Sequence, residues 1–325
     1  MILSVVIPTH DKVDLLRRTL AALRNQDPGP DRPWEIIVVD DGSSDGTARY
    51  LAGAAERPGV PLRVVAPPGN VGRARARNLG ARAAAGHWIL FLDDDIVAPA
   101  GLLRAHLDVL EAHPGHGTIG RVVTAPELRD AAHFDYLDSR GVGRLAAGPA
   151  PARFFVTQNA AVPRAAFLAV GGFDEAFSAY GFEDMEVAFR LEDEAGLRFL
   201  ALPDPAPAHV HHHTLAQYLE KKVECGRHSL PHLARLHPHR LREMGLHHAV
   251  DVPGEAGSSA ATRILRWLVD GPRGRFLWRW VGSWPVGPDG RPRVAAVYRK
   301  VMNLTVLACF RQGLRQAARH DTLAS

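Results

Sequence analysis

The chain has 325 residues, of which 46% are hydrophobic and 23% are charged, a globular composition that excludes wholesale disorder. Its two cysteines, Cys225 and Cys309, are too few for a disulfide framework and lack the spacing of a metal site, which fits a reducing compartment. The formal net charge of +4 is polarised, because residues 261–325 carry 12 basic and 3 acidic residues, a local charge of +9, and the rest of the chain is slightly acidic.

The N-terminal residues show no basic segment ahead of an apolar run and no cleavage site, so they do not resemble a signal peptide. No apolar run approaches the roughly 20 residues needed to span a bilayer. We therefore expect a soluble or peripheral protein that is cytoplasmic or attached at the inner face of the membrane.

The first 100 residues alternate short apolar runs with amphipathic segments. This pattern predicts strands at Leu3–Ile7, Glu35–Val39, Leu62–Ala66 and His87–Leu92, and helices at Asp14–Leu23, Ser44–Ala55 and Val71–Ala85. Continuous apolar strands that alternate with helices indicate an α/β fold with a mostly parallel sheet covered on both faces. Ligands are then expected outside the carboxyl ends of the strands.

The elements predicted after residue 100 are less regular. We expect helices at 101–113, Arg164–Val170, Phe182–Glu194 and Thr214–His228, strands at Phe154–Val162 and Arg198–Leu202, and a Gly/Pro/Ala-rich connection at 125–150. Residues 251–260 have the composition of a linker, and helical segments rich in Arg and Trp follow it.

Polar residues close three of the four early strands: Pro8-Thr9, Asp40-Asp41 and Asp93–Asp95. Asp93 and Asp95 form a D-x-D pair that suits one hard divalent ion bound to phosphate oxygens, and an acidic turn before a helix is the alternative. Asp41 and its neighbour could accept hydrogen bonds from a nucleotide, or could cap a helix. No G-x-G-x-x-G follows the first strand, which disfavours a dinucleotide site.

Three further groups are candidates for the same edge. Arginines at 73, 75 and 77 open a predicted helix, where they would bind phosphate or form a solvated basic face. Glu183-Asp184 could supply a general base or decorate a first helical turn. His209 and His211 share one face of an extended segment, so one or both could ligate a metal, or be structural.

The ordered series VVIPTHD (5–11), EIIVVDDGSSDGT (35–47), NVGRARARNLG (70–80), ILFLDDDI (89–96), GGFDEAF (171–177) and FEDME (182–186) resembles the family 2 glycosyltransferases. The resemblance covers about residues 2–230. It implies an inverting enzyme of the GT-A fold that uses a nucleotide sugar, with UDP as the expected carrier. It divides the chain into a GT-A domain at 1–250, with a nucleotide-binding half at 1–100 and an acceptor-binding half at 101–250, and a helical extension at 251–325.

The resemblance also implies residue roles. Donor binding is expected from Pro8, Thr9, Asp40, Asp41, Arg77, Asp93 and Asp94. Asp95 and Asp93 would bind Mn²⁺ or Mg²⁺ at the diphosphate, with His209 as an imidazole ligand and His211 as the fallback. Asp184 would be the general base, with Glu183 as the second choice. The sequence departs from the family at His10-Asp11, and it lacks the Q-x-x-R-W motif of processive synthases, which favours transfer of a single sugar to a hydroxyl acceptor.

Two other functions fit parts of this pattern. A nucleotidyltransferase that makes the sugar nucleotide would need a Gly-rich loop after the first strand, and the segment from Pro8 to Lys12 has no glycine. A non-catalytic nucleotide-binding protein could retain the fold, but the intact D-x-D and Glu-Asp pairs argue against it.

The extension has its own pattern, with Trp267, Trp278, Trp280 and Trp284 interleaved with Arg263, Arg266, Arg273, Arg275 and Arg279. A basic aromatic helix can lie on an anionic membrane, which would suit a lipid-linked acceptor. The favoured alternative is that the extension packs on the catalytic domain or forms a homodimer contact. No nucleic-acid partner is expected, because the basic residues belong to no recognised module.

Overall fold

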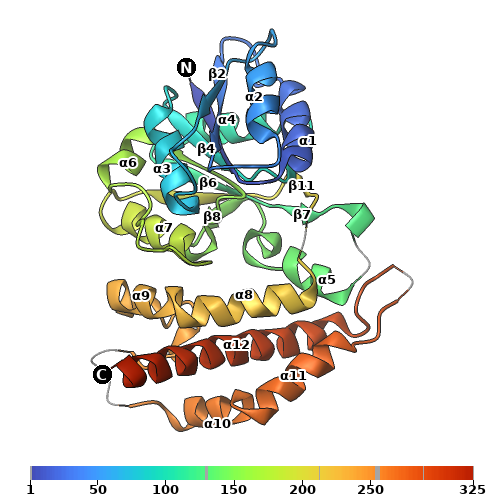
Figure 1. Cartoon of the computed structure of the whole chain (residues 1–325), viewed down its shortest axis with the longest axis vertical. Helices are drawn as coiled ribbons and strands as arrows, with labels where there is room; N and C mark the ends of the chain where they lie inside the picture. Colours follow the sequence, from blue (N-terminus) through green and yellow to red (C-terminus); the bar gives the residue numbers. More distant parts are fainter. Residues whose placement is uncertain (1, 129–130, 212, 253–256, 288, 325) are drawn as a thin grey trace. The chain divides into compact units, whose positions relative to one another are not determined.

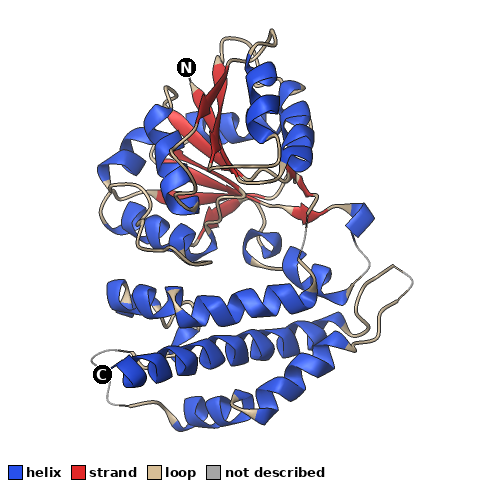
Figure 2. Cartoon of the chain, in the orientation of Figure 1, coloured by secondary structure: helices blue, strands red, loops and turns tan. Residues whose placement is uncertain are grey.

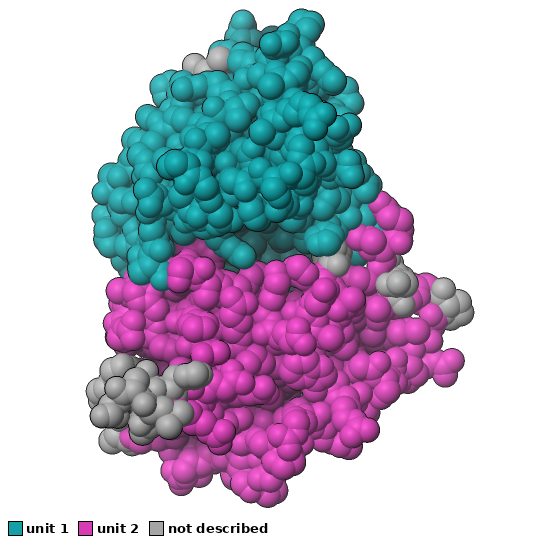
Figure 3. All heavy atoms as spheres, in the orientation of Figure 1, with its two compact units in different colours: residues 1–126, 138–176, 184–212 teal, residues 127–137, 177–183, 213–325 magenta. Residues whose placement is uncertain are grey.

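The computed structural model describes residues 2–128, 131–211, 213–252, 257–287 and 289–324, with side chains up to residue 319 (Figure 1). The chain divides into two compact units (Figure 3): unit 1 contains residues 1–126, 138–176 and 184–212, and unit 2 contains residues 127–137, 177–183 and 213–325. This division is one of packing. The functional boundary expected after residue 250 stays a prediction.

A large mixed sheet forms the centre of unit 1 (Figure 2). Its strands, in spatial order, are β3 (Leu62–Val65), β2 (Trp34–Asp40), β1 (Leu3–Thr9), β4 (Trp88–Leu92), β9 (Asn159–Pro163), β6 (His116–Gly120), β10 (Arg198–Leu202) and β8 (Gly148–Ala150). Strands β9 and β8 run opposite to the others, so the predicted mostly parallel sheet is confirmed. A small second sheet joins β5 (Ile96–Val97), β11 (Ala208–His209) and β7 (Val123–Thr124).

The helices of unit 1 cover both faces of the sheet. They are α1 (Val13–Arg24), α2 (Thr47–Ala55), α3 (Arg73–Ala83), α4 (Leu102–Ala112), α6 (Arg164–Ala169) and α7 (Glu183–Asp193), with 3-10 turns at Gly141–Arg144 and Ala152–Phe154. Alternate residues of β1 face opposite layers, as the pleat requires. Val5 and Ile7 pack with Leu16 of α1 in one apolar cluster. On the other face Gly80 of α3 lies so close to Val6 that an added Cβ would come within 2.4 Å of Val6 Cγ1.

Unit 2 is helical. It contains α5 (Ala132–Asp138), α8 (Leu215–Arg227), α9 (Ser229–Leu236), α10 (Ala260–Val269), α11 (Pro272–Gly282) and α12 (Ala295–Ala324), with 3-10 turns at Pro126–Leu128, Pro238–Arg240 and Leu246–His248. Helix α12 packs along α8, where Gly226 and Gly313 let the two backbones approach closely. Helices α11 and α10 also pack on α12. Among the described helices, none combines the length and the apolar character needed to cross a bilayer.

Two sequence expectations for the middle of the chain are wrong. Residues 125–150 are no simple connection, because α5 and β8 form there. The strand expected at Phe154–Val162 begins only at Asn159. Phe155 is fully buried and its ring lies 5.4 Å from that of Phe199, so its apolar character reflects core packing outside a strand. The short strand β6 was not predicted, since its sequence HGTIG contains two glycines and only one large apolar residue.

His106 joins α4 to the sheet through two buried hydrogen bonds. Its Nδ1 lies 2.7 Å from Thr118 Oγ1 on β6, and its Nε2 lies 2.8 Å from Asn159 Oδ1 on β9. Burial lowers the pKa of His106 from 6.5 to about 4, although the contact with Asn159 acts in the opposite direction.

This pKa predicts a specific loss of stability in acid. Below pH 6.5 the unfolded chain takes up a proton at His106 that the folded chain refuses until about pH 4, so stability falls as the pH falls through this range. His106→Gln keeps hydrogen-bonding capacity without a titrating group, and its free energy of unfolding should fall about 3 kcal/mol less than that of the wild type. Urea unfolding followed by circular dichroism at pH 6.5 and at about pH 4 measures the fall in the free energy of unfolding for each protein. Equal losses in the two proteins would contradict the assignment.

Candidate functional site

The carboxyl ends of β1, β2 and β4 lie side by side because these strands are parallel neighbours in the sheet. The turn after β2 is held there by Asp41, whose backbone N–H donates to Thr9 O at 2.9 Å. Its carboxylate accepts the N–H of Val71 at 2.6 Å and of Gly72 at 3.1 Å. Asp41 therefore fixes the loop that leads into α3, the helix that carries Arg77.

Gly42 allows the same turn to close. Its φ is +76°, and an added Cβ would lie 2.7 Å from backbone atoms of Gly69 and Asn70, so no other residue fits without strain. Asp40 is buried and accepts the Ser43 N–H at 3.1 Å. Both carboxylates predicted for nucleotide binding thus shape the loop at the strand end.

Asp94 and Asp95 are buried beside β1 and share one ammonium group. Lys12 Nζ lies 2.9 Å from Asp94 Oδ1 and 2.9 Å from Asp95 Oδ2. The Thr9 hydroxyl donates to Asp94 Oδ2 at 2.8 Å. His209 Nε2 lies 3.0 Å from the other oxygen of Asp95, and that oxygen accepts no well-aligned hydrogen bond from the described residues. A cation, an imidazole and two carboxylates therefore meet at one point of the sheet edge.

The small sheet brings His209 to this point. Strand β11 is antiparallel to β5, with His209 opposite Ile96, and the Val210 N–H donates to Asp95 O at 2.9 Å. His211 lies beyond the end of β11 and is exposed. Of the two histidines that the sequence left open, it is His209 that contacts Asp95.

Arg77 links two further predicted residues. Its side chain is 7% exposed, and Nη2 donates to Asp93 Oδ1 at 2.8 Å. Its Nη1 lies 4.0 Å from Asp184 Oδ1 near the start of α7. Thr157 orients the Asp184 carboxylate, since its hydroxyl donates to Oδ1 at 3.0 Å and its N–H to Oδ2 at 3.3 Å.

The pKa values of the two buried carboxyls, Asp94 and Asp95, are shifted in opposite directions. Burial raises the pKa of Asp94 to about 6, against the lowering effect of Lys12. Burial would also raise the pKa of Asp95, but the nearby His209 imidazole and Lys12 ammonium outweigh it and lower that pKa. The Asp95 and Asp94 carboxylates in turn raise the pKa of Lys12 against the effect of burial. The ionised form is therefore favoured more strongly at Asp95 than at Asp94.

The structure thus brings the predicted residues together in three groups: the Asp41 turn, the Asp94–Asp95 pair with Thr9 and His209, and the Arg77–Asp93–Asp184 group. Pro8 is half-buried one residue before Thr9. Glu183 is 3% exposed and belongs to unit 2, while Asp184 belongs to unit 1. What each residue does in catalysis stays a prediction.

Sequence reasoning missed Lys12 and Thr157. Lys12 is separated by 82 and 83 residues from the carboxylates that it contacts, and Thr157 by 27 residues from Asp184. The sequence signal for Lys12 was its place directly after the first strand, at the edge where ligands are expected. Thr157 lies in a segment expected to be a strand, where its hydroxyl had no evident partner.

Known proteins resemble this chain in sequence. A family model described as "Glycosyl transferase family 2" matches residues 4–171. The validoxylamine A glucosyltransferase of Streptomyces hygroscopicus subsp. limoneus is 32% identical in an alignment of 227 residues that covers 58% of this chain and 48% of that protein. The chain spans about half the length of this relative and of its counterpart from another strain.

Solved structures show a similar fold. The mannosyltransferase PcManGT from Pyrobaculum calidifontis, in complex with GDP-Man and Mn²⁺, aligns with a TM-score of 0.62 at 20% identity and covers 98% of this chain and 87% of its own. TarS 1-349 from S. aureus, in complex with UDP-GlcNAc, aligns with a TM-score of 0.55 at 15% identity, covering 98% and 92%. The expected GT-A fold with a helical C-terminal extension is confirmed.

Because Lys12 pairs with both Asp94 and Asp95, we expect the free energy of unfolding to depend on Lys12. Lys12→Met leaves two buried carboxylates without their ammonium partner and should lower the free energy of unfolding by about 2 kcal/mol, below the value for a fully buried pair because 35% of the Lys12 side chain is exposed. Urea unfolding in EDTA at neutral pH measures the loss. Lys300→Met, at an exposed position of α12, is the matched control. A loss no larger than that of the control would contradict the expected dependence.

Proposed function

Since the chain belongs to glycosyl transferase family 2, we propose that it moves a single sugar from a nucleoside diphosphate sugar to an acceptor hydroxyl, with inversion at the anomeric carbon. One observation carries the proposal: the Asp41 turn, the Asp95–His209 pair and the Arg77–Asp184 group lie in unit 1 at or beside the ends of neighbouring strands. Such a transfer needs three parts: a site for the base of the nucleotide, a cation site and a general base.

The residues at Asp95 fit a divalent metal. Asp95 Oδ1 and His209 Nε2 are 3.0 Å apart, about the separation of adjacent ligands around an octahedral ion. The Lys12 ammonium against Asp94 and Asp95 shows that this place accepts a positive charge. Mixed carboxylate and imidazole ligands favour Mn²⁺ over Mg²⁺. Asp93 is paired with Arg77, so its own coordination to the metal stays a prediction.

A divalent ion held by Asp95 and His209 would neutralise charge on the diphosphate leaving group. The chain's own residues do the rest. The place proposed for the base and ribose is surrounded by Asp41, Asp40, Thr9 and Pro8. The Arg77 guanidinium lies beside Asp93, where it adds positive charge next to the proposed position of the diphosphate.

Asp184 is the proposed general base. Thr157 donates hydrogen bonds to both of its oxygens, so the orientation of the carboxylate is fixed. It takes the proton from the acceptor hydroxyl as that oxygen forms a bond to the anomeric carbon. The bond from that carbon to the diphosphate oxygen breaks in the same displacement, and its electron pair leaves with the nucleoside diphosphate. One displacement inverts the configuration, and no enzyme nucleophile is needed.

UDP is the proposed carrier of the sugar. One similar structure holds UDP-GlcNAc and another holds GDP-Man, so both bases are known among proteins of this fold. The acidic turn at Asp40 and Asp41 suits the N–H of a uracil-like base and the ribose hydroxyls, both of which donate hydrogen bonds.

The role of Asp184 gives a direct kinetic prediction. Asp184→Asn keeps the shape of the side chain and removes its basicity, so transfer should fall by about a hundredfold or more. Nucleotide binding, followed as protection against thermal unfolding, should persist because Asp184 is not in the proposed donor contacts. Glu183→Gln on the same helix is the matched variant and should retain more transfer. Full transfer by Asp184→Asn would exclude Asp184 as the base.

Metal dependence gives a second prediction. A true donor sugar nucleotide should raise the thermal midpoint in Mn²⁺ by mass action, with a stabilisation of about 2.7 kcal/mol at a hundredfold excess over its Kd. EDTA should remove most of this shift. In Mn²⁺, Asp95→Ala should show a thermal shift as small as that of the wild type in EDTA. Asp14→Ala, an exposed acidic control in α1, should behave as the wild type. A full, metal-independent shift would contradict the metal site.

A further inference from the structure

Helices α10 and α11 expose large apolar side chains in unit 2. The exposed fractions are 61% for Ile264 and Trp267, 45% for Leu268, 66% for Phe276 and 43% for Trp280. The opposite side of α10 is buried at Thr262 and Val269. In soluble proteins such a concentration of exposed apolar side chains marks a surface that binds something. We call the exposed apolar residues and the arginines described below the α10–α11 face.

The face is continuous from one helix to the next. The Arg273 guanidinium stacks over the Trp267 ring at 4.0 Å, and its Nε donates to Trp267 O. On α11 the ring centroids of Phe276 and Trp280 are 6.4 Å apart, and the ring of Trp284, just beyond the end of α11, lies 5.3 Å from that of Trp280. The two helices therefore present one aromatic surface.

The charge of the face is of one sign. Arg263, Arg273, Arg275 and Arg279 are exposed and form no ion pair with an acidic residue in the described chain. The only acidic residue of the two helices and their connection, Asp270, is already neutralised by Arg311 and Arg315 of α12. At helical spacing, Arg275–Arg279 runs next to Phe276–Trp280, so positive and apolar rows alternate.

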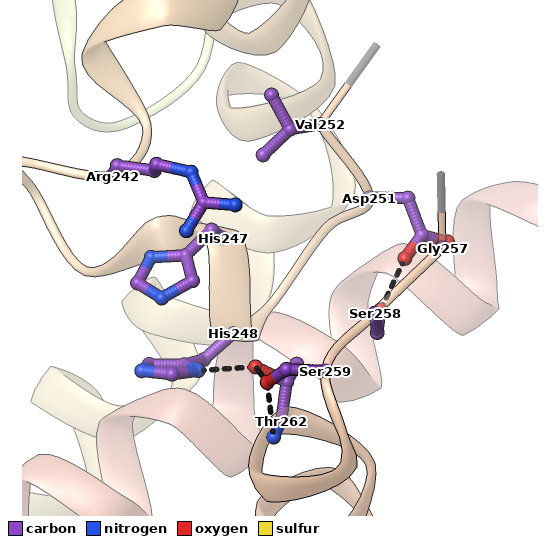
Figure 4. A pocket seen from close by; sticks show the side chains of 9 residues that line it. All are labelled: Arg242, His247, His248, Asp251, Val252, Gly257, Ser258, Ser259 and Thr262. Carbon is purple, nitrogen blue, oxygen red and sulfur yellow. Dashed lines mark hydrogen bonds between the residues drawn. The ribbon is translucent and has the colours of Figure 1, made fainter. Parts of the chain in front are cut away.

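The beginning of α10 is firmly anchored, which keeps its apolar side turned outward. Ser259 caps the helix by accepting the Thr262 N–H at 3.1 Å, and Thr262 contacts His248 at 3.1 Å (Figure 4). Arg266 pairs with Asp251 at 2.7 Å. A small pocket lies where α10 is attached, and its lining includes His248, Asp251, Ser259 and Thr262.

We propose that the α10–α11 face binds the surface of an anionic lipid bilayer. Apolar and aromatic side chains beside arginines are what an interfacial helix needs, because the rings enter the headgroup region and the arginines meet anionic headgroups. Neither helix is long enough to span a bilayer, so the chain lies on the membrane. The sequence favoured packing on the catalytic domain or dimerisation for this segment. Helix α12 does pack along α8, but Trp267 and Phe276 stay exposed, and their exposure is the observation behind the proposal.

Charge argues against the other occupants. A two-fold contact between copies would bring this face against itself and set its four arginines near their own equivalents. The cores of protein interfaces are also depleted of charge. A nucleic acid would match the arginines, but its phosphates would leave Ile264 and Phe276 with no apolar partner.

Membrane attachment also deepens the proposed function, on which this step rests. A chain held at a bilayer would meet an acceptor hydroxyl carried on a lipid at high local concentration.

The test uses the full chain and vesicles, without donor or metal. Vesicles of phosphatidylcholine mixed with phosphatidylglycerol should carry the wild type on flotation, and vesicles of phosphatidylcholine alone should bind it weakly. Trp267→Gln with Phe276→Gln should lower the partition coefficient by at least about tenfold. Arg275→Gln with Arg279→Gln should lower binding to the anionic vesicles by about thirtyfold. Leu236→Gln, an exposed leucine of α9, is the control and should bind as the wild type.

The altered side chains are exposed, so circular dichroism should show all variants folded. Absence of wild-type binding to anionic vesicles, or equal binding by every variant, would overturn the proposal. A different result would also overturn it: light scattering shows that the wild type is a dimer and the Trp267 and Phe276 variant a monomer, and neither protein binds vesicles. Because no donor is present, none of these outcomes depends on sugar transfer.

Discussion

The structure depends on the way in which crowded carboxylates are neutralised at the ends of β1, β2 and β4. Parallel strands bring Asp41 and the Asp93–Asp95 run to the same edge, where like charges repel. Each carboxylate has a positive or N–H partner: the loop before α3 for Asp41, Arg77 for Asp93, and Lys12, which Asp94 and Asp95 share. The edge can therefore be acidic and folded at the same time.

This compensation explains why the site is both ordered and ready for a charged ligand. The partners of the carboxylates come from different parts of the chain, so the loops they join are fixed before any ligand binds. Lys12 is the partner that a divalent ion would replace, because its side chain is still 35% exposed while the carboxylates are nearly buried. Arg77 differs from Lys12, because its side chain is buried between Asp93 and Asp184.

The sequence predicted the fold of residues 1–100 well because the strands there consist mostly of apolar residues. It failed where local pattern and tertiary context disagree: α5 lies in a segment rich in breakers, and Phe155 is apolar for packing reasons. The two-residue strands β5 and β11 have no periodicity to detect, yet their pairing decides that His209 reaches Asp95. Lys12 could not be assigned because its partners are more than 80 residues away. Likewise, composition described the Trp/Arg-rich extension but could not tell which side of α10 faces solvent.

We propose above all that Asp95 and His209 together hold the metal that carries the donor diphosphate. Electron paramagnetic resonance of Mn²⁺ bound to the chain with UDP, after labelling of the histidines with nitrogen-15, tests it directly. If both residues are ligands, one spectrum should show hyperfine coupling to both phosphorus and a histidine nitrogen, and the nitrogen coupling should be lost in His209→Gln. Phosphorus coupling without nitrogen coupling in the wild-type protein would contradict it, because the metal would then be carried by the nucleotide without His209.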